Sequence, residues 1–276
     1  MRAYATSDLH ADFQANRALV ETLSETEHLE DLLVVAGDIG HRLELICEVL
    51  MGLRRRFARV FFVPGNHDLW VRGAEGDSIS RFEELLERCR DLGVDTAPDR
   101  VGQVQVVPLF SWYEPALDGG GEVPRRWADQ RHCRWPAHVA SPAEYFASLN
   151  EPRLRALQIE ELPCSGSGSD DAGSTSGESP VQTSDDRACL TITCSHFLPR
   201  RDLLPPDPLL RYAALPKVAG TPRLERQLRA AGADIHVFGH SHIRLDEVID
   251  GVRYVQHSLA YPRERREPRP VLKQIG

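Results

Sequence analysis

Residues 32–68 read LLVVAGDIGHRLELICEVLMGLRRRFARVFFVPGNHD. A continuous apolar run at 32–37 is followed by helical periodicity over 43–57 and by a second apolar run at 60–63. Apolar strands separated by helices are typical of parallel strands that are buried on both faces and joined by crossover helices. This stretch therefore predicts a strand–helix–strand unit of an α/β fold.

The same alternation continues on both sides of this unit. The further expected strands are 2–7, 104–110, 190–195 and 235–238, and the further expected helices are 13–24, 79–92, 151–162 and 222–231. A hairpin is expected over 245–255, because Asp250-Gly251 can supply the positive φ angles of a tight turn. The pattern predicts one large α/β unit without internal repeats.

Two segments differ in composition from the rest. Residues 111–150 hold three of the four tryptophans and several prolines with little periodicity, so we expect an insertion built mainly from loop. Residues 164–187 are Ser, Gly and Asp with almost nothing apolar, and burial cannot offset the entropy of ordering them. We expect a disordered surface loop there.

Composition and charge exclude several classes of protein. The chain has 276 residues, 41% hydrophobic and 27% charged, which are ordinary globular values. Its net charge of −8 argues against a general nucleic-acid binder, and no run approaches the roughly 18 apolar residues of a membrane helix. The six cysteines form no CxxC pair, and the first residues show no secretory apolar core. We therefore expect free thiols and a cytoplasmic setting.

Polar side chains that can bind metals follow five of the expected strands. They are Asp8 and His10 after the first strand, Asp38 after the second, Asn66, His67 and Asp68 after the third, His196 after 190–195, and His240 and His242 after 235–238. Ligands gather at the carboxyl ends of strands in open α/β sheets. Each element alone is weak, because turns and helix caps use the same residue types. Five together predict one convergent site.

The series DLH, GD, GNHD, SH and GHSH resembles the calcineurin-like metallophosphoesterase superfamily, from Asp8 to His242. The resemblance implies a four-layer α/β/β/α sandwich with a binuclear metal centre at the carboxyl ends of the strands. Because His196 must return to the site that holds Asn66, residues 1–276 are expected to form a single domain. The segments 111–150 and 164–187 are then insertions within it.

The resemblance also implies a ligand set. One metal would be held by Asp8, His10 and His242, the other by Asn66, His196 and His240, and Asp38 would bridge them. Imidazole and oxygen donors without thiolate suit two divalent ions, Mn²⁺, Fe or Zn²⁺. A bridging carboxylate can hold two metals about 3.5–4 Å apart, the separation used for in-line displacement at phosphorus.

The implied chemistry is hydrolysis of a phosphate ester by a metal-bridged hydroxide, with Asp38 as the catalytic bridge. The resemblance marks His67 as the proton donor to the leaving group or as a cation beside the phosphate. His41, three residues after Asp38, departs from the phosphoprotein phosphatases, which carry Asp there, and from the purple acid phosphatases, which carry Tyr. A His at this place is similar to DNA-repair nucleases and some bacterial phosphodiesterases, and His41 is a candidate phosphate contact.

Substrate recognition requires residues outside the metal ligands. The candidates are Trp70, His41, Trp112, Tyr113, Arg125, Arg126, Arg131, Arg200 and Arg201. Arginine suits a second anionic group because its planar fork binds phosphate or carboxylate through two hydrogen bonds. The basic, proline-rich run 262–270 is expected to pack over the surface.

Three functions stay open at this level. The leading one is an enzyme, a phosphatase that hydrolyses a small phosphomonoester. The first alternative is a phosphodiesterase acting on a cyclic nucleotide or nucleic acid, although the net charge disfavours nucleic acid. The second alternative is a non-catalytic scaffold that keeps the fold, which the complete ligand set disfavours. The expected partner is a small phosphorylated substrate. We expect no association with a membrane, and the oligomeric state is left open.

Overall fold

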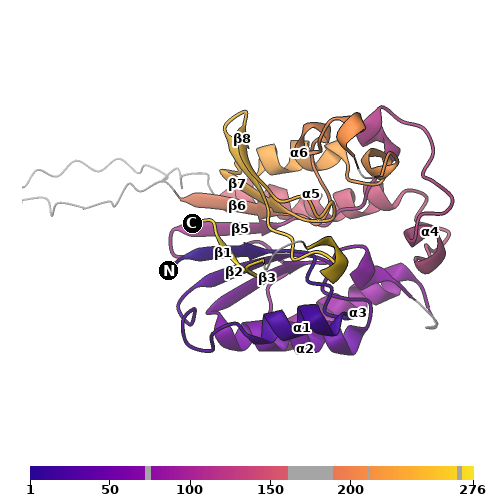
Figure 1. Cartoon of the computed structure of the whole chain (residues 1–276). Helices are drawn as coiled ribbons and strands as arrows, with labels where there is room; N and C mark the ends of the chain where they lie inside the picture. Colours follow the sequence, from indigo (N-terminus) through magenta and orange to yellow (C-terminus); the bar gives the residue numbers. More distant parts are fainter. Residues whose placement is uncertain (72–75, 161–188, 211, 266–268) are drawn as a thin grey trace, which may run out of the picture.

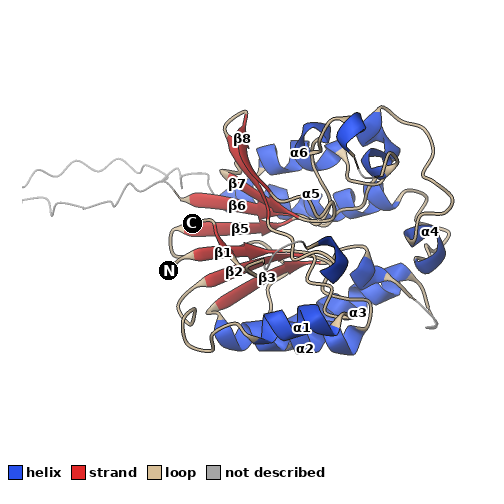
Figure 2. Ribbon diagram, in the orientation of Figure 1, coloured by secondary structure: helices blue, strands red, loops and turns tan. Residues whose placement is uncertain are grey.

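Two β-sheets packed face to face form the centre of the computed structural model, with helices on both outer faces (Figures 1 and 2). The structure describes residues 1–71, 76–160, 189–210, 212–265 and 269–276. The layers are those of the α/β/β/α sandwich that the resemblance implies. The loop expected at 164–187 lies outside the described residues.

The first sheet has four strands in the order β10-β1-β2-β3. Strands β1 (Ala3–Thr6), β2 (Leu32–Ala36) and β3 (Arg59–Val63) run parallel, and β10 (Lys273–Gln274) is antiparallel to β1. Helices α1 (Gln14–Glu21), α2 (Leu43–Arg56) and α3 (Ser78–Asp91) cover its outer face (Figure 1). The strand expected at 60–63 is β3, which begins one residue earlier, at Arg59.

Side chains of this sheet alternate between two hydrophobic cores. Leu33 and Val35 of β2 pack with Ile46 and Leu50 of α2 under the helical layer. Val34, between them, faces the second sheet and joins the core that both sheets share. Because every residue of β2 is fully buried, the strand has to be apolar on both faces, which explains its continuous run.

The second sheet has six strands in the order β4-β5-β6-β7-β9-β8. Strands β5 (Val104–Pro108), β6 (Leu190–Cys194), β7 (Ile235–Phe238) and β9 (Val252–Gln256) are parallel, and β4 (Asp99–Val101) and β8 (Leu245–Ile249) are antiparallel edges. Helices α5 (Pro142–Glu160) and α6 (Pro222–Ala230) cover its outer face (Figure 1). The expected hairpin is confirmed, since Asp250 and Gly251 have φ angles of 48° and 82°.

The insertion after β5 contains more helix than expected. Residues 142–150, predicted as loop, form the first half of α5, with the buried residues Ala143, Phe146 and Leu154 on the helix face that packs inward. Pro152 inside the helix hides this continuity in the sequence, because proline removes a helical hydrogen bond. A short helix, α4 (Asp129–His132), also lies in the insertion.

Short 3₁₀ turns occupy the loops beyond the strand ends. They are Pro115–Asp118, Arg201–Leu203, Asp207–Leu209, Leu215–Lys217, His67–Leu69 and Pro262–Glu264. The carboxyl ends of the parallel strands of both sheets point to the same edge of the molecule (Figure 2). That edge is where the expected ligands meet.

Two further expectations can be compared with the described residues. The cysteines at 47, 89, 133, 189 and 194 are free thiols, as expected, and Cys164 lies outside the described residues. Of the helices in the described part of the chain, none combines the length and apolarity that crossing a membrane requires.

Candidate metal centre

The loops that follow the strands hold their polar side chains with a strained backbone. Seven described residues other than glycine have a positive φ, and five of them are expected metal ligands: Asp8 (51°), His10 (42°), Asp38 (57°), His240 (71°) and His242 (58°). This left-handed conformation is unfavourable for residues with a Cβ atom and persists where the surrounding structure enforces it. The strain therefore concentrates at one site.

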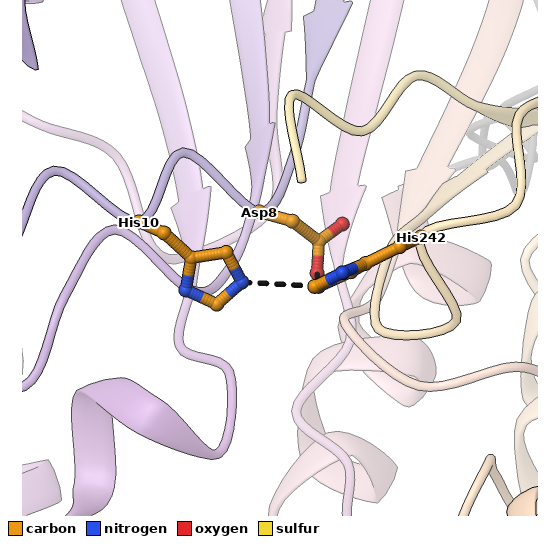
Figure 3. A group of neighbouring side chains, drawn as sticks. All are labelled: Asp8, His10 and His242. Atoms are coloured by element: carbon orange, nitrogen blue, oxygen red, sulfur yellow. Dashed lines mark hydrogen bonds and ion pairs between the residues drawn. The ribbon is translucent and has the colours of Figure 1, made fainter. Parts of the chain in front are cut away.

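Asp8, His10 and His242 form the first cluster (Figure 3). The two Nε2 atoms of His10 and His242 lie 3.0 Å apart, and His242 Nε2 lies 3.4 Å from Asp8 Oδ1. Asp8 and His10 come from the end of β1, and His242 comes from the end of β7 in the other sheet. The cluster exists only because the two sheets stack with their strand ends aligned.

Asn66, His196 and His240 form the second cluster. Asn66 Oδ1 lies 3.1 Å from His196 Nε2 and 3.0 Å from His240 Nδ1, and the two imidazole nitrogens are 3.3 Å apart. Asp38 lies between the clusters, with Oδ2 3.5 Å from His196 Nε2 and 4.0 Å from His10 Nε2. The carboxylate of Asp38 therefore faces both groups.

Two glycines of the motifs, Gly65 and Gly239, are required because neighbouring segments of the chain lie too close to leave room for a Cβ atom. A Cβ atom at Gly65 would overlap the Asp38 carboxylate and approach the Asp38 backbone nitrogen to 2.7 Å. At Gly239 it would lie 2.7 Å from the carbonyl oxygen of Ala36 and 2.9 Å from Asp8 Oδ2. Any other residue at these places would push a ligand loop away from the site.

Asp68 joins two of the ligand loops. Its Oδ2 accepts backbone N–H bonds from Asp38 and Gly65, both at 2.8 Å, and its Oδ1 accepts from Ile39 at 2.9 Å and Gly40 at 3.1 Å. Burial raises the pKa of Asp68 to about 6, although the backbone N–H groups oppose that shift. Its role is to fix the loop of Asp38 against the loop of Asn66.

Asp129 of α4 orients Asn66, and sequence reasoning missed it. Its Oδ1 accepts from Asn66 Nδ2 at 2.9 Å and from Trp70 Nε1 at 2.7 Å, while its Oδ2 accepts from Trp127 Nε1 at 2.9 Å. The carboxylate is buried. Because Nδ2 of Asn66 is taken by Asp129, the amide oxygen faces His196 and His240.

The segment after β9 supplies two further residues that sequence reasoning missed. Glu264 Oε2 accepts from His242 Nδ1 at 2.6 Å, and the Tyr261 hydroxyl lies 3.1 Å from His67 Nε2. The Tyr261 ring stacks on His10 with centroids 4.3 Å apart. Glu264 belongs to the basic run 262–270 expected to pack over the surface, and Tyr261 directly precedes this run; both residues pack on the candidate metal centre.

His67 stands beside the clusters and outside them. Its backbone N–H donates to Asp38 Oδ1 at 2.9 Å, and its ring stacks on Trp70 with centroids 3.8 Å apart. Its Nε2 atom lies 3.9 Å from Asp38 Oδ2. Burial and the neighbouring His10 lower the pKa of His67, so the free site holds it neutral.

Electrostatics at the site favours a neutral imidazole at His10 and His240 and a charged one at His242. Burial, with the nearby imidazoles, lowers the pKa of His10 and of His240. Burial raises the pKa of Asp38, and the nearby Asp68 and Asp8 raise it further. For His242, burial acts in the opposite direction, but Asp8 and Glu264 raise its pKa to about 9.

In the second cluster, the hydrogen bond of His196 to the Ala36 carbonyl leaves His196 and Asn66 with lone pairs directed at each other. His196 Nδ1 lies 2.9 Å from the carbonyl oxygen of Ala36, which can only accept, so Nδ1 carries the proton of the neutral ring. His196 Nε2 then presents a lone pair to the amide oxygen of Asn66, another acceptor. Two acceptors at 3.1 Å repel each other unless a cation lies near both.

The donor set therefore fits divalent metal ions. Asp8 and Asp38 are buried, and in the described part of the chain neither pairs with a lysine or an arginine. His242 and His196 each direct the other ring nitrogen to an acceptor, Glu264 and the Ala36 carbonyl, which is how metal-binding histidines are oriented. Nitrogen and oxygen donors without thiolate suit the ions expected from the sequence.

A cavity of about 590 Å³ opens at the metal centre. The part of its lining that belongs to the metal centre, here called its floor, consists of Asp38, Asn66, His67, His240 and His242. Its other lining residues are Trp70, Trp127, Ala128, Asp129, Tyr212, Leu215, Ser241, Tyr261, Glu264, Arg126, Arg131 and Arg263. These residues come from the chain after β3, the insertion after β5, and the segments after β6, β7 and β9.

The other expected substrate residues lie away from this cavity. Trp112 and Tyr113 are buried and pack on Phe197, beneath the ring of His240. His41 Nδ1 pairs with Asp12 Oδ1 at 3.1 Å, and its ring centroid is 6.3 Å from that of Trp70.

Arg200 and Arg201 line a separate cavity of about 900 Å³. Arg200 pairs with Asp202, Glu225 and Asp250, and Arg201 pairs with Asp118 and Asp207. Both guanidinium groups thus pair with carboxylates of the chain itself.

The fold and the two linked clusters define a metallophosphoesterase, a metal-binding hydrolase that acts on phosphate ester bonds. The chain belongs to the calcineurin-like phosphoesterase family, whose sequence profile matches residues 1–139. It is 29% identical over 289 positions to the [acyl-carrier-protein] phosphodiesterase PptH of Mycobacterium tuberculosis, covering 99% of this chain and 82% of that protein. The crystal structure of phosphopantetheinyl hydrolase (PptH) from the same organism superposes with a TM-score of 0.72 and 27% identity, covering 99% and 95% of the two chains.

Proposed function

We propose that this metallophosphoesterase hydrolyses the phosphodiester bond that joins phosphopantetheine to a carrier protein. The observation that carries the proposal is the similarity to PptH, a phosphodiesterase by name, which extends over 99% of this chain at a TM-score of 0.72. The sequence alone favoured a small phosphomonoester and kept a diester as the alternative. The similarity to PptH makes the diester the better candidate.

The cavity supports a substrate with an extended arm. Its volume of about 590 Å³ falls in the range of pockets that enclose small molecules. Trp127, Tyr212 and Leu215 give it apolar and aromatic walls, while the floor is polar. A phosphodiester with a flexible amide arm on one side would meet both kinds of surface.

We propose that the first cluster binds one metal ion and the second cluster binds the other, with Asp38 as the bridge. The ligands are Asp8, His10 and His242 for the first ion and Asn66, His196 and His240 for the second. The ions, when bound, supply a hydroxide at neutral pH and neutralise the charge of the phosphate. Mn²⁺, Fe and Zn²⁺ all suit the donor set, so we propose a pair drawn from these. Asp68 and Asp129 keep the ligands Asp38 and Asn66 in place without touching the ions.

The proposed reaction adds water across one P–O bond. Hydroxide attacks phosphorus, the bond to the leaving alkoxide breaks, and a proton passes to that oxygen. We propose that His67 holds this proton; the contacts of its ring with Trp70 and the Tyr261 hydroxyl support this role. A bound phosphate brings negative charge beside His67, which raises its lowered pKa toward neutrality.

Purified protein loaded with Mn²⁺ can test the proposal with a phosphopantetheinylated carrier protein as substrate. We expect release of 4′-phosphopantetheine, detected by mass spectrometry of the small-molecule fraction. The carrier protein should be left with a free serine, detected by intact-protein mass spectrometry. In ¹⁸O-labelled water, the label should enter the released phosphate. Bis-p-nitrophenyl phosphate should be hydrolysed faster than p-nitrophenyl phosphate.

Two controls make the test decisive. The Asp38→Asn variant should be inactive on every substrate, because it removes the bridging charge. Carrier protein without the phosphopantetheine arm should show no change in mass. If the holo-carrier protein keeps its mass while p-nitrophenyl phosphate is hydrolysed fast, a phosphodiester substrate would be rejected. A small phosphomonoester would then again be the better candidate substrate.

A further inference from the structure

Three exposed arginines of the cavity lining, here called the mouth arginines, have no carboxylate partner among the residues that the structure describes. Arg126, Arg131 and Arg263 are exposed and line the cavity. Among the residues that the structure describes, none of the three forms an ion pair with an acidic side chain. Arg263 lies over the ring of Tyr261, with 5.3 Å from its guanidinium carbon to the ring centroid.

Arginines at the other cavity show the contrast. Arg200 pairs with Asp202 at 2.7 Å and with Asp250 at 2.8 Å, and Arg201 is also held by two carboxylates. The side chains of Arg200 and Arg201 therefore already form ion pairs within the chain. The mouth arginines have no such carboxylate within the described part of the chain, and we infer that they can bind an external anion.

The arginines come from two separate walls. Arg126 and Arg131 belong to the insertion around α4, and Arg263 belongs to the segment after β9. A third segment adds apolar surface, since Tyr212 lines the cavity with 48% of its area exposed and Leu209 nearby in the chain is 75% exposed. Arginine and tyrosine are enriched in protein interfaces, and exposed apolar side chains grouped with them indicate a contact surface.

The net charge of the chain indicates how an acidic partner protein would approach it. The chain carries −8, so an acidic protein is repelled by the surface as a whole. A local group of unpaired arginines around the cavity would attract such a partner only in the orientation that brings it to the mouth. Complementary charge of this kind raises the rate and the selectivity of association.

We propose that Arg126, Arg131 and Arg263, with Tyr212 of the same cavity lining, form a docking surface for an acidic face of the carrier protein. The inference rests on the proposed function and deepens it. The arm of the partner would enter the cavity while its acidic face contacts the arginines. Selectivity for a protein substrate would then reside at the mouth, away from the metal ligands.

The test compares two substrates with one triple variant, R126A/R131A/R263A, loaded with Mn²⁺. The readout is the ratio of kcat/KM for holo-carrier protein to kcat/KM for bis-p-nitrophenyl phosphate, which has no protein to dock. We expect this ratio to fall at least tenfold, mainly through a higher KM for the carrier protein. In the unmodified enzyme, kcat/KM for the carrier protein should also fall as salt is raised, because salt screens exposed charges.

A matched control removes the same charge elsewhere. The variant R55A/R90A/R226A changes three exposed arginines, two of them in the last turns of α2 and α3 and one in α6. It should keep the ratio of the unmodified enzyme. A similar fall in this control would mean that net charge alone sets the affinity, and would overturn the docking surface.

The outcomes separate the two proposals. If the unmodified enzyme does not cleave the carrier protein, the proposed function fails and the docking surface fails with it. If it does cleave the carrier protein and the triple variant keeps the ratio, only the docking surface fails. An equal loss on both substrates would place the arginines at the reacting phosphate and would also overturn it.

Discussion

Asp129 Oδ1 accepts a hydrogen bond from Asn66 Nδ2 at 2.9 Å, and this contact connects the insertion after β5 to the metal centre. An amide has one donor end and one acceptor end, so holding the donor determines which atom the rest of the site meets. The oxygen of Asn66 consequently lies 3.1 Å from His196 Nε2 and 3.0 Å from His240 Nδ1. A residue outside both clusters thus decides how a candidate ligand is presented.

Asp129→Ala should weaken metal binding at the second cluster by about 10–100-fold, the usual effect of removing a residue that orients a ligand. Asn66 would be free to turn its amide group toward His196, where the NH₂ group cannot bind a cation. Titration with Mn²⁺, followed by elemental analysis, should show one ion lost before the other. Asp118→Ala changes another acidic residue of the same insertion, paired with Arg201, and should bind both ions normally. Normal affinity in Asp129→Ala would refute the orienting role.

Asp38→Ala should lose both ions together, because its carboxylate faces both clusters. Metal per chain and hydrolysis of bis-p-nitrophenyl phosphate should fall in parallel, measured on the same preparation. Asp12→Ala is the control, since Asp12 is a nearby carboxylate that pairs with His41 and faces neither cluster. Two ions retained in Asp38→Ala would disprove the bridging assignment.

Much of the ligand arrangement could be predicted from the sequence, because each ligand directly follows an apolar run. An apolar run marks a buried strand, and the carboxyl ends of parallel strands share one edge. Asp8, Asp38 and His240 are therefore placed by local sequence and by a simple rule of topology. The structure needs only to stack the two sheets for the clusters to form.

Asp129, Tyr261 and Glu264 could not be predicted in this way. Asp129 lies in a four-residue helix of an irregular insertion, and no periodicity connects it to Asn66, which is 63 positions away. Glu264 stands in a run whose charge and prolines are typical of an exposed tail. Their contacts depend on how the chain returns over the strand ends, which is decided by packing across the whole domain.

Asp31 should make the fold sensitive to acid at a place far from the metal centre. Burial opposes ionisation, but hydrogen bonds from Arg2 lower the pKa of Asp31 to about 2, against 3.8 in the unfolded chain. A group with a lowered folded pKa stabilises the protein above its unfolded pKa, and the stabilisation is lost as the pH falls from about 4 to 2. Because the Arg2 side chain is 45% exposed, we expect about 1 kcal/mol at neutral pH.

Chemical denaturation of Asp31→Asn should show this loss at pH 7 and a smaller difference from the unmodified protein near pH 3. Glu21→Gln is the matched control, because Glu21 pairs with Arg17 on the open surface and is 63% exposed. Its effect should stay within about 0.5 kcal/mol at both pH values. A constant difference for Asp31→Asn across this range would show that the hydrogen bonds matter and the ionisation does not.

His67 can be separated from the metal ligands by the identity of the leaving group. The ring touches Trp70 and the Tyr261 hydroxyl, and it belongs to neither of the two clusters, although it also lies within metal-binding reach of His10 and Asp38. His67→Asn should keep both ions and lose about 10²–10⁴-fold in kcat, the usual contribution of general acid catalysis. The loss should be larger for diphenyl phosphate than for bis-p-nitrophenyl phosphate, because p-nitrophenolate leaves readily without a proton. Tyr261→Phe removes only the hydroxyl that contacts His67, so we expect a smaller loss with the same ions bound. Equal losses on both esters would assign His67 to phosphate positioning, and loss of an ion would make it a ligand.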